Sequence, residues 1–187
     1  MIIIDNFYNN AQQVRDVALS TPFDVVGNFP GRRTKASLND ETKQELQRIL
    51  HIMNCGQVTN WQDQYTGAFQ ITTCSDRSWI HSDHSTVWAG VIYLTPNAPL
   101  SGGTGFYRHS EHGVRSTSEA GNDEKILHQL EQDGNDVTKW ELTDRISNIY
   151  NRLILYRADL FHTSMDYFGS NLHNGRLFQT FFLDTEH

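Results

Sequence analysis

The chain has 187 residues, of which 37% are hydrophobic, and it carries a formal net charge of −7. This length suits one domain with a sizeable core, predicted over residues 1–187, and the acidic balance argues against duplex nucleic acid as a partner. The sequence has no apolar run of about 18 residues, so it predicts no membrane-spanning helix and no membrane partner.

The first part of the chain, residues 1–64, is predicted to be a helical front that supports a β-rich body. Residues 2–4 predict a short strand, and residues 9–20 predict a helix. The apolar positions expected on the buried stripe of that helix are Ala11, Val14, Val17 and Ala18. Residues 29–34 predict a turn or loop that carries two arginines.

A second helix is predicted over residues 40–53, with Ser37 or Asn39 as its N-cap. Its expected buried stripe consists of Leu46, Ile49, Leu50 and Met53. Helices with one apolar stripe commonly pack on one face of a sheet, so both helices are expected to do so here.

The doublet His81 and Asp83 lies between two runs that predict strands, residues 68–72 and 87–94. A histidine and an aspartate two positions apart are common by chance, so the weight of the motif comes from these surroundings. Strand ends hold side chains in fixed positions, and the doublet is expected at such an end.

The second histidine of interest, His162, ends the apolar run 153–161, which predicts a strand followed by a turn. Two imidazoles and one carboxylate can occupy one face of an Fe(II) ion and leave three positions open. His81, Asp83 and His162 are therefore the predicted metal ligands and the predicted catalytic centre. Asp159 is the alternative carboxylate.

Arg176 opens a further run that predicts a strand, residues 176–183. In an alternating pattern, Arg176, Phe178, Thr180 and Phe182 share one face. A buried guanidinium is costly unless an anion meets it, and its planar fork suits a carboxylate. Arg176 is therefore predicted to bind a carboxylate.

The order of these groups, with the glycine-rich residues 102–106 between them, resembles the Fe(II)/2-oxoglutarate-dependent dioxygenase superfamily, especially its prolyl-4-hydroxylase-like branch. The resemblance covers about residues 65–184. It implies a mainly β fold with flanking helices: a double-stranded β-helix (jelly-roll, cupin-like) barrel of two facing sheets, with the N-terminal helices packed on one sheet.

The same resemblance implies the roles of the site residues. His81, Asp83 and His162 would bind Fe(II), Arg176 would pair with the distal carboxylate of 2-oxoglutarate, and the hydroxyl of Tyr93 would donate to that carboxylate. Dioxygen would be the oxidant, with ascorbate as an optional reductant. The reaction implied is hydroxylation of a peptidyl, amino-acid or other small organic substrate, with release of succinate and carbon dioxide.

The chain departs from the pattern of these relatives in two places. Many of them place Ser or Thr two positions after the arginine, where this chain has Phe178, so Thr180 or Tyr93 is expected to supply that hydroxyl. The loop 163–175 is also longer than in many relatives. For the C1 carboxylate of 2-oxoglutarate the candidates are Gln70, Thr72 and Tyr65.

Residues 110–147 are the most polar part of the body and contain one predicted short helix, residues 123–132. They are predicted to be an insertion, either a lid over the site or a surface loop. Arg32, Arg33 and Arg115 have two interpretations, as solvated charges or as groups that hold an anionic substrate.

Two other classes of function fit the three metal-binding residues. The first is a cupin-like module that binds a metal or a small acid without turnover, and the second is a zinc hydrolase, although no glutamate near the motif offers a general base.

The two cysteines, Cys55 and Cys74, lack a metal-binding spacing and are expected to be reduced thiols. Together with an N-terminus unlike a secretion signal, they predict a cytoplasmic location. The sequence makes no prediction about the oligomeric state.

Overall fold

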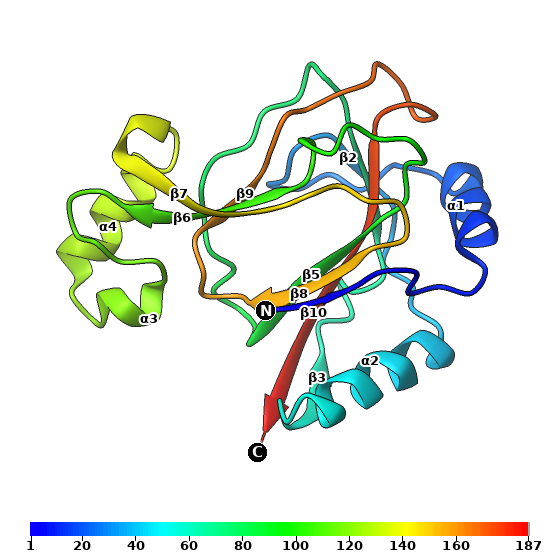
Figure 1. Cartoon of the computed structure of the whole chain (residues 1–187), viewed down its shortest axis with the longest axis horizontal. Helices are drawn as coiled ribbons and strands as arrows, with labels where there is room; N and C mark the ends of the chain where they lie inside the picture. The colour runs from blue at the N-terminus through cyan, green and yellow to red at the C-terminus, as the bar shows by residue number, and fades with distance from the viewer. Residues whose placement is uncertain (187) are drawn as a thin grey trace.

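The computed structural model describes residues 1–186, in which ten strands and four α-helices are arranged as two antiparallel sheets with helices at their margins (Figure 1). The strands are β1 (Ile2–Ile4), β2 (Arg32–Arg33), β3 (Gln57–Trp61), β4 (Phe69–Thr72), β5 (Trp88–Tyr93), β6 (Thr104–His109), β7 (Trp140–Ile146), β8 (Leu153–Arg157), β9 (His162–Ser164) and β10 (Arg176–Glu186). The helices are α1 (Ala11–Ser20), α2 (Asp40–Ile52), α3 (Thr117–Ala120) and α4 (Glu124–Asp133), with a short 3₁₀ turn, η1, at Val137–Lys139.

The major sheet has the order β1-β8-β5-β10-β4-β2, and β3 also pairs with β10. The long strand β10 therefore contacts β5, β4 and β3 and joins early and late parts of the chain. Because β1, β2 and β3 belong to this sheet, the helical front predicted for residues 1–64 is continuous with the body.

The minor sheet has the order β7-β6-β9, and it faces the major sheet. A buried apolar cluster fills the space between them, with Phe106 from β6 packed among side chains of β5, β8 and β10. Two antiparallel sheets with helices at one face are the predicted class of fold. The closure of these sheets into a complete barrel stays a prediction.

The two N-terminal helices pack on the outer face of the major sheet, as predicted. A second apolar cluster joins Ala18 of α1 and Leu46 and Leu50 of α2 to side chains of β5, β8 and β10. The predicted cap of α2 is Asn39, whose side chain accepts a hydrogen bond from the backbone N–H of Thr42 at 2.8 Å. This bond satisfies one of the free N–H groups at the start of the helix.

Two side chains predicted to be buried on these helices are exposed. Val17 is 57% exposed, and Met53 lies just past the end of α2 and is also exposed. On α1 the buried stripe runs through Arg15 instead of Val17, because the Arg15 guanidinium donates to the carbonyls of Leu94 and His173, at 2.7 Å each. A polar residue with satisfied hydrogen bonds can thus replace an apolar one at a buried helix position.

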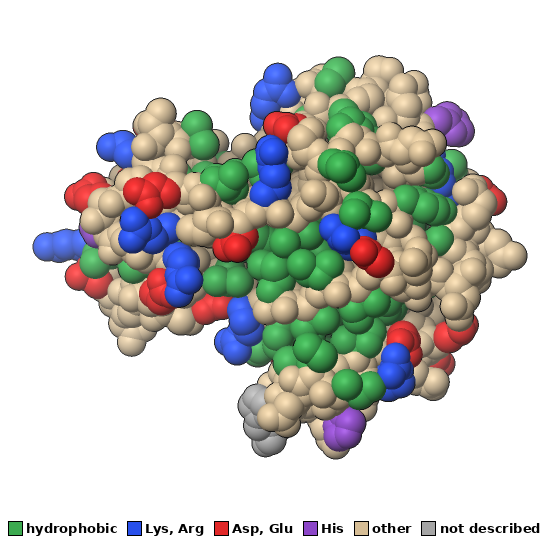
Figure 2. Space-filling model, in the orientation of Figure 1, with side chains coloured by type: hydrophobic (Ala, Val, Ile, Leu, Met, Phe, Trp, Pro, Cys, Tyr) green, Lys and Arg blue, Asp and Glu red, His purple; other side chains and the backbone are tan. Residues whose placement is uncertain are grey.

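The segment 110–147 differs from the predicted insertion. Its predicted helix is present as α4, but the segment also supplies β7, a strand of the minor sheet. Leu130 and Trp140 from this segment are buried with Ile80, Tyr107 and Phe161 in a third apolar cluster. Figure 2 shows charged side chains of both signs over the α3–α4 end of the molecule, which accounts for its polar sequence.

Replacing Leu130 by alanine should therefore destabilise the whole fold, as expected for a core residue. Leu130 is 3% exposed, and Leu-to-Ala changes at such sites cost about 2–5 kcal/mol. For a chain of this size that corresponds to a fall of roughly 5–15 °C in the midpoint of thermal unfolding. Leu142→Ala on β7 is the matched control, because Leu142 is 48% exposed and should change the midpoint little. Equal midpoints for the two variants would mean that α4 is only a surface appendage.

No helix among the described residues is both long and apolar enough to cross a bilayer. Cys55, which is partly buried, and Cys74, which is exposed, are free cysteines.

Candidate active site

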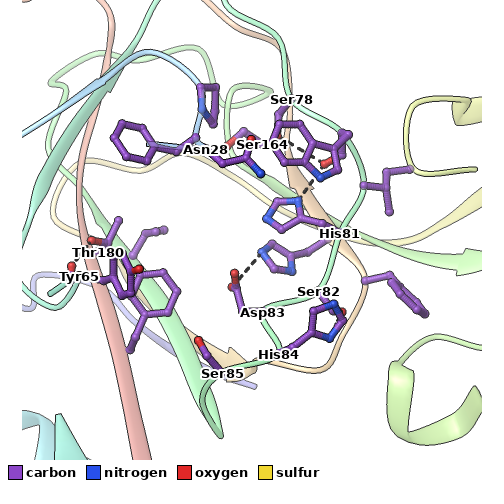
Figure 3. Close-up of a pocket in the computed structure, with 18 of the residues that line it drawn as sticks. Asn28, Tyr65, Ser78, His81, Ser82, Asp83, His84, Ser85, Ser164 and Thr180 are labelled. Atoms are coloured by element: carbon purple, nitrogen blue, oxygen red, sulfur yellow. Dashed lines mark hydrogen bonds and ion pairs between the residues drawn. The ribbon is translucent and has the colours of Figure 1, made fainter. Parts of the chain in front are cut away.

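Three side chains with metal-binding atoms converge between the two sheets. One ligand atom from each of His81, Asp83 and His162 lies within 4.8 Å of the other two, and no other such group of three occurs among residues 1–186. The Nε2 atom of His162 lies 3.5 Å from a carboxylate oxygen of Asp83. In Figure 3 His81 and Asp83 point into the cavity from the segment between β4 and β5.

Backbone pairing brings the two histidines together. His81 and His162 form an isolated antiparallel bridge, with backbone N–H groups donating to each other's carbonyls at 3.1 and 2.8 Å. The backbone N–H of Asp83 donates to the carbonyl of Ala158 at 2.7 Å. The strand and turn predicted before His162 are present as β8 and the residues that follow it, and His162 opens the next strand, β9. The strand end expected for the doublet is not found, because His81 forms only the isolated bridge and Asp83 lies in irregular chain between β4 and β5.

Hydrogen bonds orient both imidazoles. The Nδ1 atom of His81 lies 2.9 Å from the carbonyl oxygen of Trp79, and that of His162 lies 2.9 Å from the carbonyl oxygen of Leu160. Because a carbonyl only accepts, Nδ1 carries the proton in each ring, and the lone pair is on Nε2. This arrangement is typical of metal-binding histidines, in which a partner on one nitrogen fixes the other as the ligand.

The electrostatics of His162 also suit a metal ligand. Burial lowers the pKa of His162 to about 4, and the neighbouring His81 acts in the same direction, against the opposing effect of Asp83. His162 is therefore neutral at physiological pH, and a neutral imidazole is the form that binds a metal.

Arg176 begins β10 and lies almost completely buried, with 1% of its surface exposed. Its Nε donates to the carbonyl of Gly102 at 2.9 Å, and one terminal nitrogen donates to the carbonyl of Gly103 at 3.3 Å. The other terminal nitrogen, Nη1, is buried and has no hydrogen-bond partner within the described part of the chain. Since an unpartnered buried cationic donor is costly, this atom fits an anionic ligand of the cavity.

The glycine-rich residues before β6 lie against the guanidinium of Arg176. A Cβ atom at Gly103 would lie 1.8 Å from the carbonyl oxygen of Ile146, so only glycine lets the backbone approach so closely. Gly102 and Gly103 lie directly before β6, which begins at Thr104. The two glycine carbonyls hold the guanidinium in place.

Of the two residues expected to assist Arg176, Tyr93 lies beside its guanidinium. The Arg176 guanidinium lies 5.3 Å from the centre of the Tyr93 ring, and the Tyr93 hydroxyl shares a hydrogen bond of 2.8 Å with that of Thr104. Burial raises the pKa of Tyr93, so its hydroxyl keeps its proton. Thr180 instead donates to the backbone carbonyl of Tyr65 at 2.8 Å. Thr104, which lines the cavity, was not a sequence candidate.

The three candidates for the second carboxylate of 2-oxoglutarate have different surroundings. Tyr65 and Gln70 line the cavity, but both ends of the Gln70 amide already bind protein groups. Thr72 is not among the lining residues, although its hydroxyl is buried and has no partner within residues 1–186. Tyr65, half exposed, lies with Thr180 across the cavity from His81 and Asp83 (Figure 3).

The cavity has a volume of about 1220 Å³ and contains His81, Asp83, His162 and Arg176 on its walls. This is larger than a typical site for one small ligand, so a co-substrate and a substrate can occupy it together. Residues of α3 and α4, such as Ser118 and Leu127, line one end, and the segment 25–30 lines another part. Helices α3 and α4 belong to the segment 110–147, for which the sequence left a lid over the site and a surface loop as alternatives. Residues 25–28 carry no chemical motif and were not candidates from sequence. Arg33, which also lines the cavity, was only one of three arginines considered for an anionic substrate.

The sequence matches, over residues 1–183, the family described as "Family of unknown function (DUF6445)". No curated protein matches it in sequence. Among solved structures, HygX from Streptomyces hygroscopicus, with nickel and 2-oxoglutarate bound, has a TM-score of 0.61 at 12% identity, covering 96% of this chain and 80% of HygX. A Pseudomonas putida prolyl-4-hydroxylase has a TM-score of 0.57 at 11% identity, covering 100% of this chain and 92% of that one.

A prolyl hydroxylase from Trichoplax adhaerens, solved with a peptide fragment of hypoxia inducible factor, has a TM-score of 0.53 at 14% identity and covers 97% of this chain and 82% of its own. Identities this low show a shared fold and no more. The double-stranded β-helix fold of the Fe(II)/2-oxoglutarate oxygenases, including prolyl-hydroxylase-like relatives, is thereby confirmed for this chain.

Proposed function

The chain belongs to the family of unknown function DUF6445, and for this member we propose the activity of a non-haem Fe(II)- and 2-oxoglutarate-dependent oxygenase. The observation that carries the proposal is one cavity with two features on its walls. The first is a set of two histidines and one aspartate with their ligand atoms together, and the second is a buried arginine with a free donor. Fe(II) suits the first feature, and a dicarboxylate suits the second.

Each residue has one task in this proposal. His81 and His162 present their unprotonated Nε2 atoms and Asp83 presents its carboxylate to Fe(II), which leaves three coordination positions open. Arg176 binds the distal carboxylate of 2-oxoglutarate through its free terminal nitrogen, with the Tyr93 hydroxyl beside it. With dioxygen, this metal and co-substrate supply oxidative decarboxylation to succinate and carbon dioxide, and one oxygen atom enters a C–H bond of the substrate. Ascorbate is an optional reductant.

The fold of the chain suits this chemistry in a further way. The metal-binding residues lie between two packed sheets, and the α3–α4 end covers part of the cavity that they line. Walls of this kind limit the access of water to a reactive centre. We propose a peptidyl, amino-acid or other small organic molecule as the substrate, and hydroxylation as the outcome.

Two alternatives use the same three metal-binding residues. A zinc hydrolase would need a general base, and Glu131 of α4 lines the cavity and could serve as one. A binding module would hold a metal or a small acid without turnover. The hydrolase gives no role to Arg176, whereas a metal-chelating dicarboxylate gives a role both to Arg176 and to the metal-binding residues. The binding module differs from the oxygenase in the absence of turnover.

Co-substrate turnover in the presence of defined metals separates these functions. Purified protein should bind 2-oxoglutarate more tightly with Fe(II) than without metal, and should release succinate slowly when air is admitted, even without substrate. Succinate release should disappear when zinc replaces iron or when air is excluded. Zinc-dependent hydrolysis without any need for 2-oxoglutarate would support the hydrolase, and binding of both ligands with no succinate under any condition would support the binding module.

A further inference from the structure

Arg33 is a second arginine on the wall of the cavity, and its partners hold it in one place. It lies on β2, opposite Gln70 of the neighbouring strand β4. Its Nε donates to the side-chain oxygen of Gln70 at 3.0 Å, and one terminal nitrogen donates to the same oxygen. The guanidinium also lies 4.0 Å from the centre of the Phe29 ring. Gln70 is itself fixed, because its amide nitrogen donates to the carbonyl of Pro30 at 2.7 Å.

No carboxylate neutralises this cation. Within residues 1–186, no acidic oxygen lies within 4.0 Å of a nitrogen of Arg33, and Gln70 is a neutral partner. Burial lowers the pKa of Arg33 to about 10, an effect that Asp83 opposes, so Arg33 stays charged at physiological pH. Glu131 also lines the cavity, but it is exposed on α4 and forms no ion pair with Arg33. A cation held rigidly in a cavity without an anion suggests that a ligand brings the anion.

The inference about Arg33 rests on the proposed function, which fixes the other charges in the cavity. In the loaded site, the charges of Fe(II) and Arg176 are balanced by Asp83 and by the two carboxylates of 2-oxoglutarate. Arg33 is then the cation of the cavity wall that remains without a counter-charge. A substrate with one negative group would balance it.

The position of Arg33 separates it from the arginine assigned to the co-substrate. Strand β4 lies between β2 and β10, so these two strands are two strand spacings apart, about 10 Å, and Arg33 is also offset by two residues along β10 from Arg176. Arg33 pairs across the sheet with Gln70, and Gln70 pairs with Phe178. The two guanidinium groups therefore start from different strands, and each can serve a separate anion.

We infer that Arg33 binds a carboxylate of the primary substrate, which makes that substrate a small carboxylic acid. The planar guanidinium of Arg33 is held by Gln70 and stacked on Phe29, and its remaining N–H groups are available to bind a carboxylate. Aromatic side chains near it, Tyr65 and Phe182, line the same cavity and pack edge to face, with ring centres 6.1 Å apart. They form a wall for the hydrocarbon part of the acid, and Figure 3 shows Tyr65 across the cavity from His81 and Asp83.

The test compares acids with their amides on protein that cannot turn over. Protein loaded with Ni(II) and 2-oxoglutarate is titrated with hexanoate, phenylacetate and N-acetyl-L-amino acids, each beside its primary amide, and binding is followed by ligand-observed NMR. The wild type should bind the best acids at least about tenfold more tightly than their amides, as expected for a charge-assisted contact. Arg33→Met should lose that preference, and Arg33→Lys should keep part of it, because the charge remains without the fork.

The neighbouring arginine provides the matched control. Arg32 lies on the same strand but is exposed and does not line the cavity, so Arg32→Met should bind acids and amides as the wild type does. Thermal unfolding of all three variants shows whether each is folded, and Arg33→Lys keeps the comparison valid if Arg33→Met is not.

Four results would overturn the assignment, and the first three concern the acids. They are equal binding of acids and amides by the wild type, absence of binding by every acid, and an acid preference that survives in Arg33→Met. A loss of 2-oxoglutarate affinity in Arg33→Met with unchanged acid binding would instead place Arg33 in the co-substrate site, and would also overturn it. If the wild type took up neither Ni(II) nor 2-oxoglutarate, the proposed function would fail separately. The acid and amide comparison on metal-free protein would then still decide the role of Arg33.

Discussion

Replacing His81 by alanine is expected to lower the affinity of the protein for Fe(II) by at least about 100-fold and to abolish succinate release. Changes to groups that only orient a metal ligand commonly cost about 10–100-fold in affinity, and His81 is proposed to be a ligand itself. Its ring nitrogen faces the cavity because the other nitrogen donates to Trp79. An anaerobic titration with Fe(II), followed by calorimetry, measures the effect directly.

His84→Ala is the matched control for this experiment. His84 lies in the same segment and lines the same cavity, but within residues 1–186 its ring hydrogen-bonds only with the hydroxyl of Ser82, at 3.3 Å or more, and it is not one of the three proposed ligands. Its replacement should leave Fe(II) affinity within about threefold of the wild type, since nothing in the proposed coordination depends on it. Unchanged Fe(II) affinity in His81→Ala would remove the histidine from the metal site.

His162→Ala should have the same effect on the metal but a second effect on stability. The ring of His162 is buried and lies 4.7 Å from that of Tyr156, centre to centre, so its removal leaves a void in the core. The midpoint of thermal unfolding should therefore fall in His162→Ala and change less in His81→Ala, whose ring is only partly buried. Comparison of the two variants separates loss of the ligand from loss of the fold.

Replacing Arg176 by methionine is expected to weaken 2-oxoglutarate binding by at least tenfold and Fe(II) binding far less. A charge-assisted hydrogen bond contributes about 1.5–3 kcal/mol, which corresponds to roughly 10-fold to 150-fold in affinity. Methionine keeps much of the apolar contact with Phe178, over whose ring the guanidinium lies at 4.3 Å. Calorimetric titration with 2-oxoglutarate in the presence of a fixed metal gives the affinity.

Two further variants show whether the effect comes from the guanidinium fork. Arg176→Lys keeps the charge but loses the planar pair of donors, so its 2-oxoglutarate affinity should lie between those of the wild type and Arg176→Met. Tyr93→Phe should cost less than either, because it removes one neutral hydroxyl that already has Thr104 as a partner. Wild-type affinity in Arg176→Met would argue against the co-substrate role and favour the binding module.

The loss of Arg176 also removes donors from the carbonyls of Gly102 and Gly103, so some loss of stability accompanies it. Metal affinity serves as the internal control for that effect. If Fe(II) and 2-oxoglutarate binding fell by the same factor, the variant would report a damaged cavity. A selective fall in 2-oxoglutarate affinity would support the proposed contact.

The sequence by itself was sufficient to predict those features that depend on residues close together in the chain. Helix α2 and its Asn39 cap, the turn that leads into His162 and the start of β10 at Arg176 all follow from local patterns of apolar and polar residues. The candidate site residues were predicted from the chemistry of their side chains and from their order along the chain. That order resembles the order in the dioxygenase superfamily.

Tertiary structure alone decided which of these residues meet and what lies beside them. The polar strand β7 is recognisable only through its pairing with β6, more than 30 positions away, as between Arg108 and Glu141. Likewise, the cavity position of Arg33 depends on pairing with Gln70 and on packing over Phe29, and nothing in the local sequence distinguishes it from the exposed Arg32. Backbone pairing between distant segments and burial depend on the whole chain, and one-dimensional patterns report only the preferences of each segment.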